Sequence, residues 1–144
     1  MLISSTGGHF RTLANLEGFW KNQERCWVTL KNKATESALD GERVHWAIGP
    51  TNRNIGNCLK NLILAAKVVA QEKPEMVVST GAGIAVPFII MAKLSGSKVV
   101  FIESITRVEE ISLSAKLILP LLDGLYVRWQ QLQTKYPFAQ VIPV

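Results

Sequence analysis

The stretch that decides the fold runs from Met76 to Arg107 and reads MVVSTGAGIAVPFIIMAKLSGSKVVFIESITR. It opens with a short apolar run, Met76 to Val78, which leads into the turn sequence S-T-G-A-G at 79–83. An apolar helical segment, Ile84 to Leu94, follows, and a second run rich in β-branched residues extends from Lys98 to Ile102. A strand, a tight glycine turn, a helix and a second strand form a βαβ unit, which predicts a right-handed crossover into a parallel sheet.

A second strand–glycine turn–helix pattern opens the chain. The run 1–5 is followed by Gly7-Gly8-His9 and then by a helical segment expected at 10–21. Glycine lets the backbone approach a ligand closely, and a helix N-terminus attracts anions. Because ligands of open α/β sheets bind beyond the carboxyl ends of the strands, we expect the two turns to lie side by side and to hold a diphosphate. The predicted ligands are Gly7, Gly8, Ser79, Thr80, Gly81, Ala82 and Gly83, with Arg107 as a further phosphate ligand. Taken singly, each glycine is better explained by a tight turn; for the two turns together, the tight-turn and diphosphate explanations are equal.

Apolar periodicity predicts further elements on both sides of the central unit. We expect strands at 25–30, 43–48 and 125–129 and a last extended piece at 139–144. Helices are expected at 55–72, at about 110–122 and at 130–136; the first of these should bury a stripe made of Leu59, Leu62, Ile63, Ala66, Val69 and Ala70. Strands that alternate with helices predict an α/β fold, a Rossmann-like parallel sheet with helices on both faces, in one domain spanning residues 1–144.

Composition excludes several classes of protein. The chain has 144 residues, 48% of them apolar, and a net charge of +5. It has no basic run interleaved with aromatic residues, so we expect no nucleic-acid partner. Cys26 and Cys58 lie in apolar runs without metal-ligand spacing, so we expect two buried, reduced thiols, no metal and a cytosolic compartment. The apolar segments are too short for a spanning helix of roughly 20 residues, and no signal peptide is expected.

His9 and Glu103 are the candidate catalytic residues. His9 stands in the first helical turn beside the proposed anion site, where a neutral imidazole could take a proton from a hydroxyl nucleophile or could equally cap backbone groups. Glu103 ends a strand of otherwise apolar residues, a place where carboxylates usually lie at the surface or in a site. An alternative is that Glu103 forms an ion pair with Arg107 and only shapes the loop.

Several motifs together resemble one known family. These are S-S-T-G-G-H at 4–9, S-T-G-A-G-I-A-V-P-F at 79–88, F-I-E-S-I-T-R-V-E-E at 101–110 and V-R-W-Q-Q-L at 127–132. They look like the asparagine-linked glycosylation protein fourteen family, whose bacterial relatives act in polysaccharide and capsule biosynthesis. More distantly, the two glycine turns are similar to the acceptor half of the lipid-linked N-acetylglucosaminyltransferase of peptidoglycan synthesis.

The resemblance implies one half of a GT-B glycosyltransferase. A small partner subunit would hold the UDP-sugar donor, while this chain would bind a polyprenyl-diphosphate-linked sugar acceptor, with no cofactor and no metal of its own. Eukaryotic members begin with a transmembrane helix, which is not expected here. We therefore expect peripheral attachment at the inner, cytoplasmic face of the membrane, through a surface formed by Leu113, Lys116, Leu117 and Leu121. An ordinary core helix is an equal alternative for this segment. The alternative is a non-catalytic scaffold that recruits the catalytic subunit to the membrane, with the segment 136–144 as its docking element.

Overall fold

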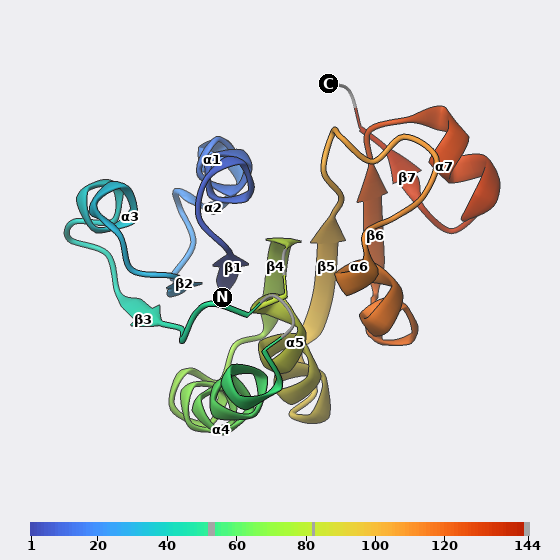
Figure 1. The fold of residues 1–144 in the computed structure, drawn as a ribbon. Helices are drawn as coiled ribbons and strands as arrows, with labels where there is room; N and C mark the ends of the chain where they lie inside the picture. The colour runs from blue at the N-terminus through green and yellow to red at the C-terminus, as the bar shows by residue number, and fades with distance from the viewer. Residues whose placement is uncertain (52–53, 82, 143–144) are drawn as a thin grey trace.

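A seven-stranded sheet forms the centre of the computed structural model, which describes residues 1–51, 54–81 and 83–142. Each neighbouring pair of strands is parallel, and the order across the sheet is β3-β2-β1-β4-β5-β6-β7 (Figure 1). The strands are β1 (Leu2–Ser4), β2 (Trp27–Thr29), β3 (Val44–Trp46), β4 (Met76–Gly81), β5 (Lys98–Ile102), β6 (Gly124–Val127) and β7 (Gln140–Val141). The expected parallel α/β fold is confirmed.

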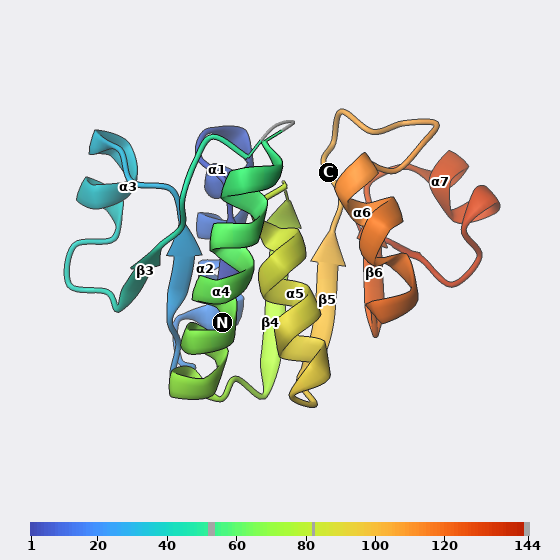
Figure 2. The ribbon, with the colours of Figure 1, turned by 60° about the horizontal axis from the view of Figure 1, so that its bottom comes forward.

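Helices cover both faces of the sheet, as expected. They are α1 (Gly8–Ala14), α2 (Glu17–Trp20), α3 (Lys33–Ala38), α4 (Ile55–Glu72), α5 (Ala85–Leu94), α6 (Leu113–Ile118), the 3₁₀ turn η1 (Leu119–Leu121) and α7 (Gln130–Lys135). Helices α1, α2 and α3 lie on one face, and α4, α5 and α6 lie side by side on the other (Figures 1 and 2). Among the residues that the structure describes, no helix is both long enough and apolar enough to cross a membrane.

The strand order reverses direction between β1 and β4. From β1 the chain moves outward to β2 and β3, then crosses back through α4 to β4 and continues to the other edge. The carboxyl ends of β1 and β4 therefore meet, with Ser4 beside Gly81, and the Ser5 N–H donates a hydrogen bond of 3.0 Å to the Gly81 carbonyl. Such a switch point is where open α/β sheets bind their ligands.

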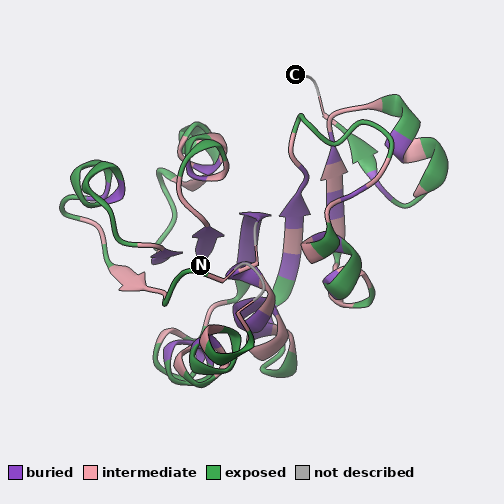
Figure 3. Ribbon diagram, in the orientation of Figure 1, coloured by how far each residue is buried: buried purple, intermediate pink, exposed green. Residues whose placement is uncertain are grey.

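Two apolar clusters lie against the two faces of the sheet. Because side chains alternate along a strand, Ile3 of β1 enters the larger cluster with Phe88 of α5, while Leu2 enters the smaller one with Leu13 of α1. Figure 3 shows the buried residues concentrated in the strands and on the inner sides of the helices. The core therefore holds the switch point from both faces.

The helix expected at 10–21 is divided into α1 and α2. The indole N–H of Trp20 donates a hydrogen bond of 3.0 Å to the Leu13 carbonyl, and the Leu16 N–H bonds to the same carbonyl at 3.1 Å. The carbonyl that a continuous helix would use is thus taken by a side chain and a tighter turn. The helix expected at 110–122 is also shorter, because Ser112 caps α6 by accepting the Ala115 N–H.

Helix α4 has the expected bounds but buries a different face. Its buried residues are Asn61, Ala65, Val68 and Val69, whereas Leu59, Ile63, Ala66 and Ala70 of the expected stripe are exposed. Asn61 points inward because its amide donates to and accepts from the backbone of Ile48, both at 2.8 Å. Turning α4 this way also leaves Cys58 exposed, so the expectation of two buried thiols is wrong; Cys26 is buried.

Leucine-to-alanine substitutions at two sites test the buried core. Leu125 of β6 is 1% exposed and Leu94 at the end of α5 is 76% exposed. We expect Leu125→Ala to lower the free energy of unfolding by about 2–5 kcal/mol, and Leu94→Ala to change it by less than about 0.5 kcal/mol. Chemical denaturation of both variants measures the difference; equal losses would contradict the placement of β6 in the core.

Candidate functional site

His9 lies at the switch point, in the first turn of α1. Its Nδ1 is 2.8 Å from the carbonyl oxygen of Thr80, and a carbonyl only accepts, so Nδ1 carries the proton. In the neutral ring Nε2 then has a free lone pair, and the described residues provide no hydrogen-bond partner for it. The hydrogen bond thus selects the tautomer and ring orientation that a general base requires.

Thr80 links the two glycine turns, and Ser79 bonds within the second one. The Thr80 hydroxyl donates a hydrogen bond of 2.6 Å to the His9 carbonyl, which reciprocates the bond from the imidazole. The Ser79 hydroxyl accepts the Gly81 N–H at 3.1 Å, and both side chains are buried. The structure therefore brings the two turns together as expected, but these two hydroxyls bond to protein groups.

Position 81 requires a glycine, both for its backbone conformation and for its contact with the His9 ring. Its φ is +109°, a region that L side chains rarely adopt, and an added Cβ would lie 3.1 Å from His9 Nδ1. The close approach of β4 to the His9 ring therefore depends on the absence of a side chain at this position.

The other predicted diphosphate ligands lie at the starts of α1 and α5. Gly7 has φ +73°, and neither α1 nor α5 has a side-chain cap, so the first backbone N–H groups of α1 lack a side-chain acceptor. At the start of α5 the Val86 N–H bonds to the Gly83 carbonyl at 3.3 Å and Pro87 has no N–H, so fewer donors are free there. Gly83 precedes α5, and an added Cβ there would lie 3.3 Å from the Thr51 hydroxyl. Ala82, also predicted as a ligand, lies outside the described residues.

Thr51 is a residue of this site that sequence reasoning missed. It stands in the loop between β3 and α4, next to the cis peptide bond Gly49–Pro50. Its side chain lies beside Gly83 of the second glycine turn. The sequence of that loop is typical of a turn. The contact of Thr51 with Gly83, however, depends on how the chain crosses from β3 through α4 to β4. None of the described residues at these turns belongs to a group of three metal-ligating side chains.

Glu103 lies at the carboxyl end of β5 and is 2% exposed. One carboxylate oxygen accepts the Ser104 N–H at 2.9 Å and the other accepts the Ser112 N–H at 2.8 Å. The carboxylate therefore closes the loop that joins β5 to α6. Its bonds favour a role in holding this loop, and its catalytic role stays a prediction.

Arg107 is exposed at the tip of the same loop. Within the described ranges its guanidinium has no ion-pair partner, so the expected pair with Glu103 is absent. The loop is also held by the Trp129 indole, which donates a hydrogen bond of 2.6 Å to the Ile105 carbonyl. Arg107 thus extends from an anchored loop at the same edge of the sheet as the glycine turns.

The residues predicted to face the membrane divide into two groups. Leu113 and Leu117 of α6 are 71% and 63% exposed, and Lys116 between them pairs with Glu110 at 2.9 Å. Leu121 is half-buried and packs against the larger core, so it is not part of the exposed pair.

Comparisons with known proteins place this chain among glycosylation proteins. The family model described as "Oligosaccharide biosynthesis protein Alg14 like" matches residues 48–144. The chain is 28% identical over 171 residues to the UDP-N-acetylglucosamine transferase subunit ALG14 of Debaryomyces hansenii, covering 97% of this chain and 73% of that protein. It is 30% identical over 160 residues to the protein of the same name from Candida albicans, covering 94% of this chain and 72% of that protein. The match to the human protein, 35% identical over 85 residues, covers 55% of this chain and 39% of the human one.

A solved structure shares the fold. The chain resembles MurG of Acinetobacter baumannii with a TM-score of 0.71 and 15% sequence identity, over 99% of this chain and 43% of MurG. At this identity the likeness shows the fold alone. The present chain therefore corresponds to less than half of the MurG chain.

Alanine substitutions at two glycines separate backbone strain from contact with His9. Gly81 and Gly96 both have positive φ, of +109° and +92°, but only at Gly81 would a Cβ meet another group. Each substitution should cost about 1–2 kcal/mol of backbone strain. We expect Gly81→Ala to cost about a further 0.5–1.5 kcal/mol, because the His9–Thr80 hydrogen bond is lost.

Chemical denaturation measures these losses, and ¹⁵N chemical shifts of the His9 ring report its tautomer. Equal losses in the two variants, with an unchanged His9 tautomer, would contradict the contact between Gly81 and His9.

Proposed function

Because this chain belongs to the Alg14-like family of oligosaccharide biosynthesis proteins, we propose that it is the acceptor-binding, membrane-associating subunit of a two-component UDP-sugar glycosyltransferase. Its acceptor is a polyprenyl-diphosphate-linked sugar, and a small partner subunit holds the UDP-sugar. The matched relatives are named UDP-N-acetylglucosamine transferase subunits, which favours N-acetylglucosamine as the transferred sugar. The observation that carries the proposal is the reciprocal bonding of His9 and Thr80 at the switch point.

His9 is the general base of the proposed reaction. Its Nε2 takes the proton of the acceptor hydroxyl as the hydroxyl oxygen attacks the anomeric carbon of the donor sugar. The bond from that carbon to the UDP oxygen breaks, UDP leaves with the electron pair, and the configuration at the carbon inverts. The backbone N–H groups at the start of α1, together with those of the glycine turn before α5, hold the acceptor diphosphate, which positions the hydroxyl. The proton on Nε2 passes to solvent before the next cycle.

Glu103 and Arg107 act together through their loop in this proposal. The buried Glu103 carboxylate accepts backbone N–H groups at both ends of the loop, from Ser104 and Ser112. This holds Arg107, whose guanidinium is available for bidentate binding of a phosphate. Glu103 is thus a positioning residue, and Arg107 contacts the diphosphate.

An exposed apolar surface supports membrane association. Ile55, Leu59 and Ile63 of α4 recur every four residues and are 78%, 56% and 62% exposed, and Leu113 and Leu117 of α6 are similarly exposed. We call these five residues the apolar helix surface. Helix α5 lies between α4 and α6 and is apolar except for Lys93. The exposed Lys60 and Lys67 on α4 add positive charge that anionic lipids attract.

The apolar helix surface lies toward the carboxyl edge of the sheet. Helices that connect parallel strands run opposite to them, so α4 begins at the edge where β3 ends, and α6 follows the carboxyl end of β5 (Figure 2). The exposed residues occupy the first half of α4 and the first turns of α6. A membrane against this surface would present lipid headgroups at the edge that carries the glycine turns. This arrangement suits an acceptor whose sugar is carried by a membrane lipid.

Substitution of His9 tests the proposed base. In the complex reconstituted with the donor-binding subunit, we expect His9→Asn to lower kcat by about 10² or more, since the asparagine amide occupies the position of Nδ1 and can still donate to Thr80 but cannot take the proton. His45→Gln, which changes the other histidine of the chain, should retain most of the activity. A radiolabelled UDP-sugar transfer assay measures both.

The same assay distinguishes the proposed function from the scaffold alternative. The hydrogen bonds that Glu103 accepts within its own loop favour that alternative. If substitutions at His9, Glu103 and Arg107 all leave turnover intact, this chain contributes no catalytic group and the scaffold function replaces the proposal.

Charge introduced into the apolar helix surface tests membrane binding. We expect Leu59→Glu combined with Leu117→Glu to weaken binding to vesicles of phosphatidylcholine and phosphatidylglycerol by at least about tenfold, because burying a leucine is worth about 1.5–3 kcal/mol. Phe19→Glu is the matched control, since Phe19 is 50% exposed on α2, across the sheet. Cosedimentation measures binding; equal retention of the double variant and the wild type would remove this surface from the proposal.

A further inference from the structure

The fold brings a cysteine, a histidine and a glutamate together at the end of the sheet opposite the glycine turns. Cys26 directly precedes β2, His45 lies in β3 and Glu72 is the last residue of α4. Register places Val28 beside His45, and Cys26 is two residues before Val28, so Cys26 and His45 point to the same face of the sheet. The end of α4 covers that face and adds Glu72.

The three side chains are close enough to share one ion. The Cys26 sulfur, a ring nitrogen of His45 and a carboxylate oxygen of Glu72 all lie within 4.8 Å of one another. His45 Nε2 and Glu72 Oε1 are already 3.0 Å apart. Ligand atoms of a tetrahedral zinc ion lie about 3.3–3.6 Å apart, for bonds of about 2.0–2.3 Å. If the Cys26 sulfur moves about 1 Å closer to the other two ligand atoms, the three atoms reach the spacing of a tetrahedral zinc site.

We propose that Cys26, His45 and Glu72 form a binding site for a divalent cation of the zinc class, which ties β2, β3 and the end of α4 together. Thiolate, imidazole and carboxylate are together the donor set that zinc prefers. The cluster is largely buried, with side chains of His45 and Glu72 only 17% and 7% exposed. This site is independent of the proposed transfer reaction, because it lies at the opposite end of the strands.

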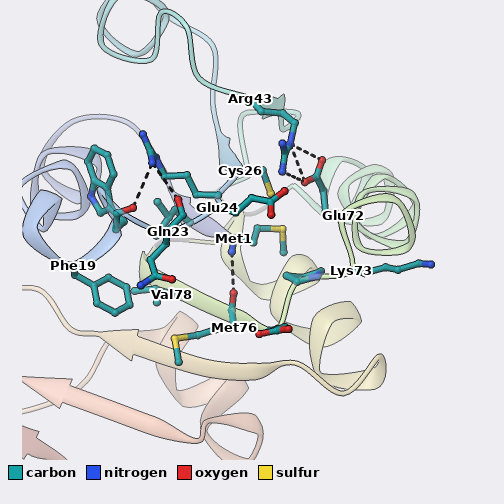
Figure 4. Close-up of a pocket in the computed structure, with 15 residues that line it drawn as sticks. Met1, Phe19, Gln23, Glu24, Cys26, Arg43, Glu72, Lys73, Met76 and Val78 are labelled. Carbon is teal, nitrogen blue, oxygen red and sulfur yellow. Dashed lines mark hydrogen bonds and ion pairs between the residues drawn. The ribbon is translucent and has the colours of Figure 1, made fainter.

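A pocket beside the cluster gives the ion access. Cys26 and Glu72 line a pocket of about 510 Å³, together with Arg43, Lys73, Met76 and other residues at this end of the sheet (Figure 4). The pocket leaves room for a water molecule as the fourth ligand. Because zinc binds the thiolate, Cys26 releases its thiol proton to solvent when the ion binds.

Arg43 is a cation that competes with the ion for Glu72. Its guanidinium bonds to both carboxylate oxygens of Glu72, at 2.8 and 3.0 Å. The Arg43 side chain is 51% exposed, so it can turn into solvent when an ion takes its place. The proposal therefore predicts that removing the Arg43 charge tightens metal binding, although it removes an ion pair.

Titration with Co²⁺ and then Zn²⁺ under reducing conditions tests the site. We expect one equivalent of Co²⁺ to give a thiolate-to-cobalt charge-transfer band that Zn²⁺ abolishes, and Zn²⁺ to raise Tm by several degrees. Cys26→Ser and His45→Ala should each weaken Zn²⁺ binding by about 100-fold or more. Arg43→Gln should bind Zn²⁺ more tightly, and Cys58→Ala, which changes the exposed cysteine, should bind as the wild type does.

Circular dichroism and Tm values measured without metal establish whether each variant is folded. If a variant is not folded, Glu72→Gln takes its place, and we expect Glu72→Gln to weaken Zn²⁺ binding as well. Absence of the charge-transfer band in the wild type, its loss in Cys58→Ala, or weaker Zn²⁺ binding by Arg43→Gln would each overturn the proposal.

Discussion

The reciprocal hydrogen bonds between His9 and Thr80 are the interaction on which the proposed site depends. They join residues of β4 and α1 at 2.6 and 2.8 Å, at the one place where the strand order reverses. One bond sets the imidazole tautomer and the other holds the start of α1 against β4. Glycine at position 81 permits this approach, so backbone conformation and side-chain chemistry are coupled here.

Much of the fold could be predicted because its signals are local. The βαβ unit follows from β-branched runs and a glycine turn, and the bounds of α4 and β5 are as expected. The pairing of the two glycine turns also follows, since parallel strands bring their carboxyl ends to one edge. These inferences need only the order of elements along the chain and the rules of parallel sheets.

The rest depends on contacts that periodicity does not encode. An apolar stripe on α4 predicts burial, yet Leu59 and Ile63 are exposed, because the amide of Asn61 finds backbone partners inside. The direction of the Glu103 carboxylate depends on the loop that returns to Ser112. The Cys26–His45–Glu72 cluster has no spacing motif, because its members come from separate elements joined by strand register and helix length.

The central place of β1 has a consequence for how similarity to other proteins is interpreted. The matched family region begins at residue 48, after the first three strands. Yet β1 lies between β2 and β4 in the middle of the sheet, and its Ile3 is fully buried. The start of the family match is thus not a folding boundary. A fragment starting there would expose the unpaired edge of β4 and lose His9, so the third of the chain that lies outside the family match is indispensable to the rest.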